Sequence, residues 1–179
     1  MKNRKSLRGM IYAAMFGAVT AVGAFIIIPI PPVPITLQTL FTALSGALLG
    51  GRLGALSQVI YVLLGIIGLP VFAGGKAGLG VLFGPTGGYL IGFIVGSYVI
   101  GKIIEIKKDA GIFLIAISMI IGFLVLYAIG ILQLSVVAKL SFVKALSVGM
   151  IPFLIGDALK IAVATFVTLK LRNRIFTKR

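Results

Sequence analysis

The residues best placed to do chemistry are Asp157 and Lys160, which lie three positions apart within an apolar run near the C-terminal end of the chain. Residues at i and i+3 of a helix project from one face, so the two side chains can reach each other or a shared partner. A charged side chain at the centre of a bilayer costs roughly 2.5 to 3.5 kcal/mol on insertion scales. We therefore expect the pair to be compensated and to face a bundle interior or a cavity.

Two interpretations fit this pair. In the first, a mutually neutralised ion pair fixes the register of its helix. In the second, Asp157 accepts N–H bonds from a ligand and Lys160 donates to a carbonyl or a carboxylate. Buried ion pairs often stabilise a protein no better than apolar replacements, which favours the ligand site. The pair follows Pro152 by a few residues, towards the expected outward half of its helix, and this position suits a cavity open to the exterior.

The rest of the composition excludes most enzyme chemistry. The chain has no Cys and no His, so it lacks thiolate and imidazole ligands, disulfides, and Ser-His-Asp or Cys-His nucleophile systems. Glu105 and Asp109 belong to a Lys-rich connection, which leaves Asp157 without a second carboxylate for metal binding or acid–base catalysis. An intramembrane enzyme acting on lipids would need such a cluster or a nucleophile with its base. We expect a binding protein with no catalytic residue, no metal and no bound cofactor.

The stretch from Gly68 to Gly88 is a further candidate part of the site. It is apolar, but it contains many glycines and two prolines, so it cannot form one helix. Irregular backbone at membrane depth is tolerated where it is buried in protein or lines a cavity. This loop, with Phe72, Gly74 and Gly75, is therefore a candidate lid over a ligand, and a simple re-entrant turn is the alternative.

A phosphate-binding loop is excluded at Gly74, Gly75 and Lys76. A Walker A motif needs a glycine separated by four residues from its Gly-Lys pair and a Ser or Thr after the lysine. Pro70 and Ala77 occupy those two positions. Active transport by this chain would have to use ATPases from other chains.

Two neutral side chains add to the candidate ligand site. Gln38 can offer a donor and an acceptor to an amide-like ligand, although an interhelical hydrogen bond explains it equally well. Tyr89 begins an apolar run and is either an anchor at the membrane interface or a ring packed on a ligand.

The elements that position these residues are expected to be membrane-spanning helices. Hydrophobic residues make up 60% of the 179 residues, the mean hydropathy is +1.22, and the apolar residues come in runs too long for the core of a soluble domain. We expect one all-α domain over residues 1–179, with six spans at about 7–28, 36–50, 53–69, 86–103, 110–132 and 148–171. The first run follows a basic head, as in a signal peptide, but its length and the lack of a small-x-small cleavage site favour a retained span.

The charge distribution predicts the topology. The chain has 17 Lys and Arg against 3 Asp and Glu, and most of the basic residues lie at the ends of the apolar runs. With six spans, thirteen basic residues lie on the side of the termini, whereas Lys76, Lys139 and Lys144 lie on the opposite side. The positive-inside rule then predicts that both termini are cytoplasmic in a multi-pass protein of the plasma membrane. The same distribution accounts for the positive charge without nucleic-acid binding.

Small residues recur every fourth position in several runs, including Ala14 and Ala18 in the first one. Such faces let helices approach closely in lipid. They indicate packing within the bundle or, for the first run, a docking surface for another membrane subunit.

Three blocks of the sequence resemble the BioY family, the biotin-binding S components of energy-coupling factor (ECF) transporters. The blocks are Pro-Val-Pro-Ile-Thr-Leu-Gln-Thr-Leu at 32–40, Gly-Leu-Pro-Val-Phe-Ala-Gly-Gly continuing to Gly-Pro-Thr-Gly-Gly-Tyr at 68–89, and Pro-Phe-Leu-Ile-Gly-Asp-Ala-Leu-Lys at 152–160. With the flanking helices, the resemblance covers nearly the whole chain.

The resemblance implies a six-helix S-component fold with an outward-facing vitamin pocket, roofed by the loop between spans three and four. It also implies that Asp157 and Lys160, which match the family's Asp-x-x-Lys motif, hold the polar groups of biotin. The candidate contacts are then Asp157, Lys160, Gln38, Phe72, Gly74, Gly75 and Tyr89. Ala14 and Ala18 resemble the face on which a transmembrane coupling protein (T component) docks, beside two ABC-type ATPases. An S component for another water-soluble vitamin is the main alternative.

Overall fold

The computed structural model describes residues 2–107 and 109–176, and within them the chain is mainly helical. The elements in order are α1 (Lys2–Phe25), β1 (Ile27–Ile28), β2 (Ile35–Thr36), α2 (Gln38–Leu49), α3 (Gly51–Ile66), α4 (Leu79–Leu82), α5 (Gly87–Glu105), α6 (Ile112–Val137), α7 (Phe142–Gly149), the 3₁₀ helix η1 (Ile151–Phe153) and α8 (Leu154–Phe176). The two strands form one short antiparallel ribbon. The all-α prediction is therefore right for the main architecture and misses this ribbon.

Five of the six predicted apolar runs each correspond to one helix, whereas the last run is divided among the end of α7, η1 and α8. We predicted one span over 148–171, whereas the chain forms α7, breaks at Met150, turns through η1 and begins α8 only at Leu154. Pro152 lies within η1, and proline has no N–H with which to continue an α-helical hydrogen-bond ladder. This break puts Asp157 in the first turn of α8.

Four segments of the described chain are long and apolar enough to cross a membrane. They are Leu7–Phe25, Gly87–Glu105, Ile112–Val137 and Phe142–Leu171, of which the last includes α7, η1 and α8. The helices α2 and α3 are apolar but shorter, with 12 and 16 residues. Length alone therefore supports four spans, and the remaining two stay a prediction.

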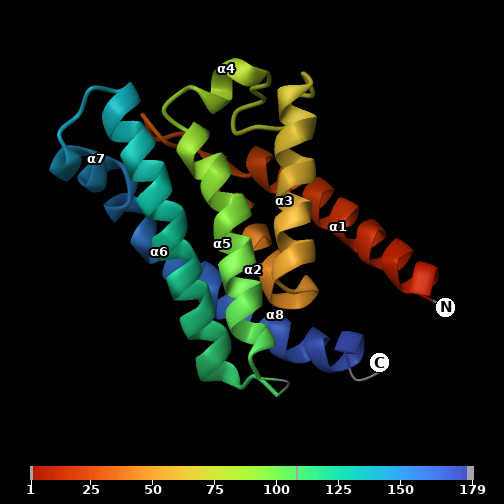
Figure 1. Ribbon diagram of the computed structural model, residues 1–179. Helices are drawn as coiled ribbons and strands as arrows, with labels where there is room; N and C mark the ends of the chain where they lie inside the picture. The colour runs from red at the N-terminus through yellow and green to blue at the C-terminus, as the bar shows by residue number, and fades with distance from the viewer. Residues whose placement is uncertain (1, 108, 177–179) are drawn as a thin grey trace.

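The bundle is built around α2, which contacts α1, α3, α5 and α8. Figure 1 shows α5 and α6 side by side, with α3 on the other side of α5 and α1 running obliquely away from the bundle. The connection between α3 and α5 lies at one end of the bundle together with that between α6 and α7, and the connection between α5 and α6 lies at the opposite end (Figure 1).

Small residues bring these helices into close contact. A Cβ atom added at Gly92 of α5 would lie 2.8 Å from the carbonyl oxygen of Leu126 in α6, and one added at Gly54 of α3 would lie 2.7 Å from Cα of Gly46 in α2. Backbones that approach this closely leave no room for a side chain. The glycine stripes of α2, α3 and α5 are thus explained by packing inside the bundle.

The first helix presents two small-residue faces with different surroundings. Ala13 and Ala21 are buried, and a Cβ added at Gly17 would lie 3.0 Å from the carbonyl oxygen of Ser57, so this face packs on α3. Ala14 and Ala18 lie on the adjacent face of the helix and are exposed. The second face has no partner within the described chain.

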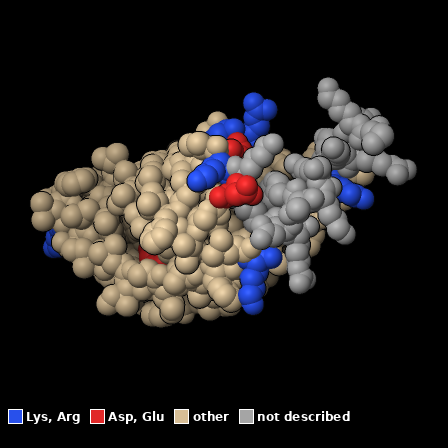
Figure 2. Space-filling view, turned by 90° about the horizontal axis from the view of Figure 1, so that it is seen from below, with Lys and Arg blue, Asp and Glu red and all other residues tan. Residues whose placement is uncertain are grey.

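Charged side chains gather at the end where α5 meets α6. Figure 2 views the molecule from this end and shows lysine, arginine and acidic side chains there, against a surface that is otherwise mostly uncharged. Glu105 forms an ion pair with Lys102 at 2.7 Å and accepts a hydrogen bond from the Gly51 N–H at 2.8 Å, which caps the start of α3. The side chains of Lys2, Arg4, Lys5, Lys108, Arg172, Arg174, Lys178 and Arg179, on which the predicted topology also depends, lie outside the described residues.

Candidate functional site

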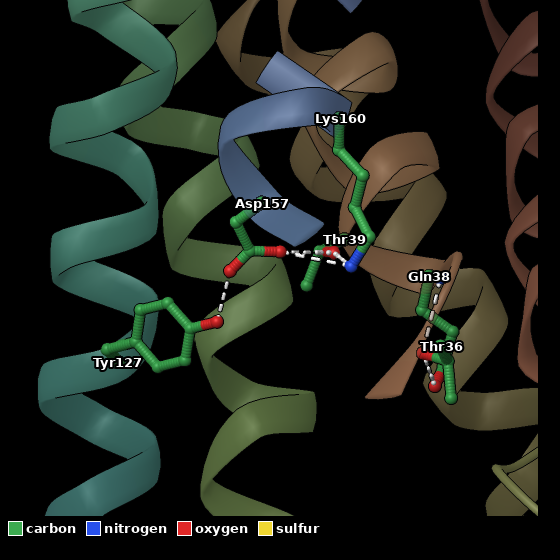
Figure 3. Close-up of polar contacts among 6 residues, drawn as sticks. All are labelled: Thr36, Gln38, Thr39, Tyr127, Asp157 and Lys160. Atoms are coloured by element: carbon green, nitrogen blue, oxygen red, sulfur yellow. Dashed lines mark hydrogen bonds and ion pairs between the residues drawn. The ribbon is translucent and has the colours of Figure 1, made fainter. Parts of the chain in front are cut away.

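The predicted pair of charged residues is joined inside the bundle. The Nζ atom of Lys160 lies 3.0 Å from Oδ1 of Asp157, and the two side chains are only 8% and 5% exposed. Both project from the start of α8, one turn apart, as the i, i+3 spacing predicts. Figure 3 shows the pair between α6 and α2.

Two further side chains complete this cluster. The Thr39 hydroxyl lies 2.9 Å from Nζ of Lys160, from which it accepts, and 3.3 Å from Oδ1 of Asp157, to which it donates (Figure 3). The Tyr127 hydroxyl donates to Oδ2 of Asp157. Both carboxylate oxygens therefore have partners, and the cluster links α2, α6 and α8. A buried carboxylate with this many donors is held in one orientation.

A pocket opens beside this cluster. Its cavity volume is about 60 Å³, within about 650 Å³ of free space that includes the open mouth. Its wall combines polar groups with five aromatic rings: Phe72, Tyr89, Phe93, Tyr127 and Phe153. Mostly apolar walls with a few directed polar groups are typical of sites for small organic ligands. The pocket is narrow as it stands, so a bulky ligand requires its walls to move apart.

The two members of the ion pair relate to the pocket differently. Lys160 and Thr39 line the pocket, whereas Asp157 lines a neighbouring groove between α6 and α8, and Tyr127 contributes to both. Lys160 is thus the member of the pair that belongs to the pocket wall, and Asp157 borders the neighbouring groove.

Gln38 lines the pocket, but its amide also has partners within the protein. Its oxygen accepts from the Thr36 hydroxyl at 2.8 Å, and its nitrogen donates to the hydroxyl of Tyr61. That hydroxyl in turn donates to the carbonyl of Val71 at 3.1 Å, at the start of the loop after α3. The interhelical hydrogen bond is therefore present, and Gln38 also lines the pocket, so its contact with a ligand stays a prediction.

The loop after α3 contributes side chains to the pocket through a tight turn. The Phe72 N–H donates to the carbonyl of Lys76 at 3.0 Å, and Gly74 and Gly75 between them have φ values of +75° and +72°, which only glycine adopts without strain. Phe72 is 2% exposed and packs edge-on against Tyr61 with ring centroids 5.7 Å apart. Phe72 and Lys76 line the pocket, but Gly74 and Gly75 do not. The two glycines shape the turn and do not form the wall.

Tyr89 is buried in the bundle. It is 6% exposed, its hydroxyl donates to the carbonyl of Gly149 at 2.9 Å, and its ring lies edge-on to Tyr127 with centroids 6.3 Å apart. A ring anchored at the lipid interface would be exposed. The arrangement favours the interpretation in which the Tyr89 ring faces a ligand pocket.

The structure also brings Thr39, Tyr127 and Phe153 to this site, and none of them stood out in the sequence. Thr39 directly follows Gln38, and Phe153 directly follows Pro152, so both lay within motifs already noted. Tyr127 lies within a long apolar run, where its position gives no signal except that its hydroxyl needs a partner when buried.

A known protein family matches almost all of this chain. The BioY family model matches residues 1–177, which is almost the entire chain. The chain belongs to the BioY family. Family membership confirms the resemblance seen in the three sequence blocks.

Individual relatives agree with the family match. The chain is 46% identical over 167 residues to a biotin transporter, BioY, of Thermotoga maritima, covering 93% of this chain and 97% of that one. It is 40% identical over 174 residues to the biotin transporter BioY of Rhizobium etli, covering 90% and 91%. Both relatives are transporters, which agrees with the expectation that this chain is not an enzyme.

A solved structure has the same fold. The S-component for biotin from an ECF-type ABC transporter is 29% identical to this chain and superposes with a TM-score of 0.88, covering 97% of this chain and 95% of that one. The chain is therefore a helical membrane protein with the S-component fold.

Proposed function

We propose that this chain captures biotin in the pocket beside Asp157 and Lys160 and takes part in its uptake together with an ATP-driven ECF module. The observation that carries the proposal is a buried, charged, hydrogen-bonded pair beside an aromatic pocket, with Lys160 in the pocket wall. The names of the relatives add the substrate, since they are biotin transporters.

The chemistry of biotin fits this pocket. Biotin has a ureido group with two N–H donors and one carbonyl, an apolar bicycle with a thioether, and a carboxylate on an aliphatic tail. Aromatic walls such as Phe72, Phe93 and Tyr89 suit the apolar bicycle. In our proposal, the Lys160 ammonium donates to an oxygen of the ligand in a charge-assisted bond worth roughly 1.5 to 3 kcal/mol.

Asp157 takes part once a ligand displaces one of its present partners. The hydrogen bond from Thr39 to Asp157 is long, at 3.3 Å, and Thr39 lines the pocket. A ligand N–H that enters beside Thr39 can therefore replace this weak bond with a shorter one to the carboxylate. In this way Asp157 and Lys160 together hold one acceptor and one donor of the ligand.

Closure over the ligand is assigned to the loop that contains Phe72, Gly74 and Gly75. Its turn supports this role because a Cβ atom added at either glycine would meet nothing within 4 Å, so the tip of the turn is clear of the bundle. Gln38 connects the same loop to α2 through Tyr61, so loop position and pocket shape are linked. Tyr89, from α5, belongs to the same pocket wall.

For the topology, we propose six spans in the plasma membrane, in a single domain over 1–179 with both termini cytoplasmic and the pocket open to the outside. The support is the positive-inside distribution and the position of the loop after α3 at the end away from the α5–α6 connection (Figure 1). Ala14 and Ala18, exposed on α1, are the proposed contact with a T component, which would couple to two ABC-type ATPases.

Calorimetric titration of the purified chain in detergent tests this function. Biotin should bind saturably at one site, whereas thiamine and riboflavin as controls should give no heat. Binding of another vitamin in place of biotin would keep the S-component fold and overturn the substrate. No binding of any of the three would overturn the proposed pocket.

A further inference from the structure

Two lysines from different parts of the chain line the pocket. Lys160 reaches it from α8 and is 7% exposed, whereas Lys76 reaches it from the loop after α3 and is exposed. Lys160 therefore lies deep in the pocket and Lys76 at its mouth. Within the described residues, no acidic side chain lines the pocket.

The two charges are compensated to different extents. Lys160 has a carboxylate partner, Asp157, at 3.0 Å, and a hydroxyl partner, Thr39. The Lys76 ammonium makes no ion pair and no side-chain hydrogen bond with any residue that the structure describes. An anionic group that enters the pocket is attracted more strongly to a cation without a counter-ion than to one that is already neutralised.

The backbone holds Lys76 in this place. Its carbonyl accepts from the Phe72 N–H at 3.0 Å, and the Gly75 N–H donates to the carbonyl of Phe72 at 3.0 Å, which closes the turn. Phe72 is buried against Tyr61, so the turn is anchored at one end. The lysine is thus presented at the mouth by a closed turn that is anchored at Phe72.

From this geometry we infer that Lys76 binds a carboxylate at the mouth of the pocket and so determines a preference for acids over their neutral analogues. The inference rests on the proposed function and adds a specificity-determining residue to it. A ligand with a polar head, an apolar body and an acidic tail would place the body between Tyr89, Phe93 and Leu126. Its charged tail then remains where water can still hydrate it, beside Lys76.

Biotin and biotinamide, which carries a neutral amide in place of the carboxylate, test this inference. The natural chain should bind biotin about fivefold more tightly than biotinamide, as expected for a partly exposed ion pair. The Lys76→Met variant should bind biotin about as weakly as biotinamide and should bind biotinamide as the natural chain does. The Lys76→Arg variant should keep the preference, and added salt should reduce it in the natural chain.

The matched control is Lys144→Met. Lys144 is an exposed lysine on α7, does not line the pocket, and is predicted to lie on the same side of the membrane. This variant should keep the full preference for biotin. The inference is overturned if Lys76→Met retains the preference for biotin. It is also overturned if the variant lowers the affinity for both ligands equally, because Lys76 would then act only by maintaining the shape of the loop. Failure of the natural chain to bind either ligand would instead overturn the proposed function.

Discussion

The deep end of the pocket and its mouth are built by different means. At the deep end, Asp157, Lys160, Thr39 and Tyr127 come from three helices and are held to one another by side-chain hydrogen bonds. At the mouth, a turn with two glycines of positive φ is held by backbone hydrogen bonds, and the Lys76 side chain extends from it without a partner among the described residues.

Because of this difference, the deep end is suited to recognising a ligand and the mouth to letting it enter. A network in which each member has a partner resists change in any one member, so the deep end presents one fixed arrangement to a ligand. A surface loop with few side-chain contacts can move while the bundle stays folded. The narrow free space of the pocket makes such movement necessary before a molecule of the size of biotin can enter.

The largest loss of biotin affinity is expected when the negative charge of Asp157, at the deep end, is removed. The Asp157→Asn variant leaves the Lys160 ammonium buried without a counter-ion, and breaking a buried pair in this way costs about 3 to 5 kcal/mol. Biotin affinity should fall by at least about a hundredfold while far-UV circular dichroism remains that of a helical bundle. Calorimetric titration measures the affinity.

The matched control for Asp157 is Glu105. It also forms an i, i−3 ion pair, with Lys102, but the two side chains are 41% and 45% exposed, and Glu105 lies at the far end of α5. Glu105→Gln should leave biotin affinity unchanged. Unchanged affinity in Asp157→Asn would remove Asp157 from the site, and equal loss in both variants would indicate a general effect on the bundle.

A smaller loss of biotin affinity is expected at Tyr127, where substitution by Phe removes the hydroxyl and keeps the ring. Tyr127→Phe keeps the ring packed against Tyr89 and Phe153 but removes the donor to Oδ2 of Asp157. A hydrogen bond to a charged group contributes roughly 1.5 to 3 kcal/mol, so we expect biotin affinity to fall about tenfold or more. Calorimetry of this variant beside Tyr98→Phe, an exposed tyrosine of α5, checks the prediction. Equal affinities in the two variants would contradict a role for the Tyr127 hydroxyl.

The sequence alone was sufficient to predict the membrane character, the approximate helices and the charged pair. Long apolar runs are a strong signal because backbone groups in lipid must be satisfied within the segment. Asp157 and Lys160 stood out because charges in such a run are costly unless they are paired. The same reasoning could not find α7 or the late start of α8, since the segment Phe142–Leu171 is apolar on average and only Pro152 marks the break.

The partners of the charged pair depend on tertiary structure. Thr39 and Tyr127 lie 118 and 30 residues from Asp157 in the chain, and no spacing rule connects them. Likewise, Gly74 and Gly75 were predicted as ligand contacts, but the structure gives them positive φ values at a turn and leaves them outside the pocket wall. Whether they contact a ligand after the loop closes remains a prediction.

The smallest loss of biotin affinity is expected from a substitution in the turn. Gly75→Ala adds a Cβ atom that meets no neighbour within 4 Å, but at φ +72° it strains the backbone by roughly 1 to 2 kcal/mol. The strain acts on the turn and not on the deep end, so biotin affinity should fall only about fivefold, with little change in the melting temperature of the bundle. Gly80→Ala is the control, because Gly80 has equally open surroundings in α4 and no positive φ, and it should be neutral. If Gly75→Ala reduced affinity as strongly as Asp157→Asn, recognition would depend on the loop as much as on the ion pair, and the division between a fixed deep end and a movable mouth would be wrong.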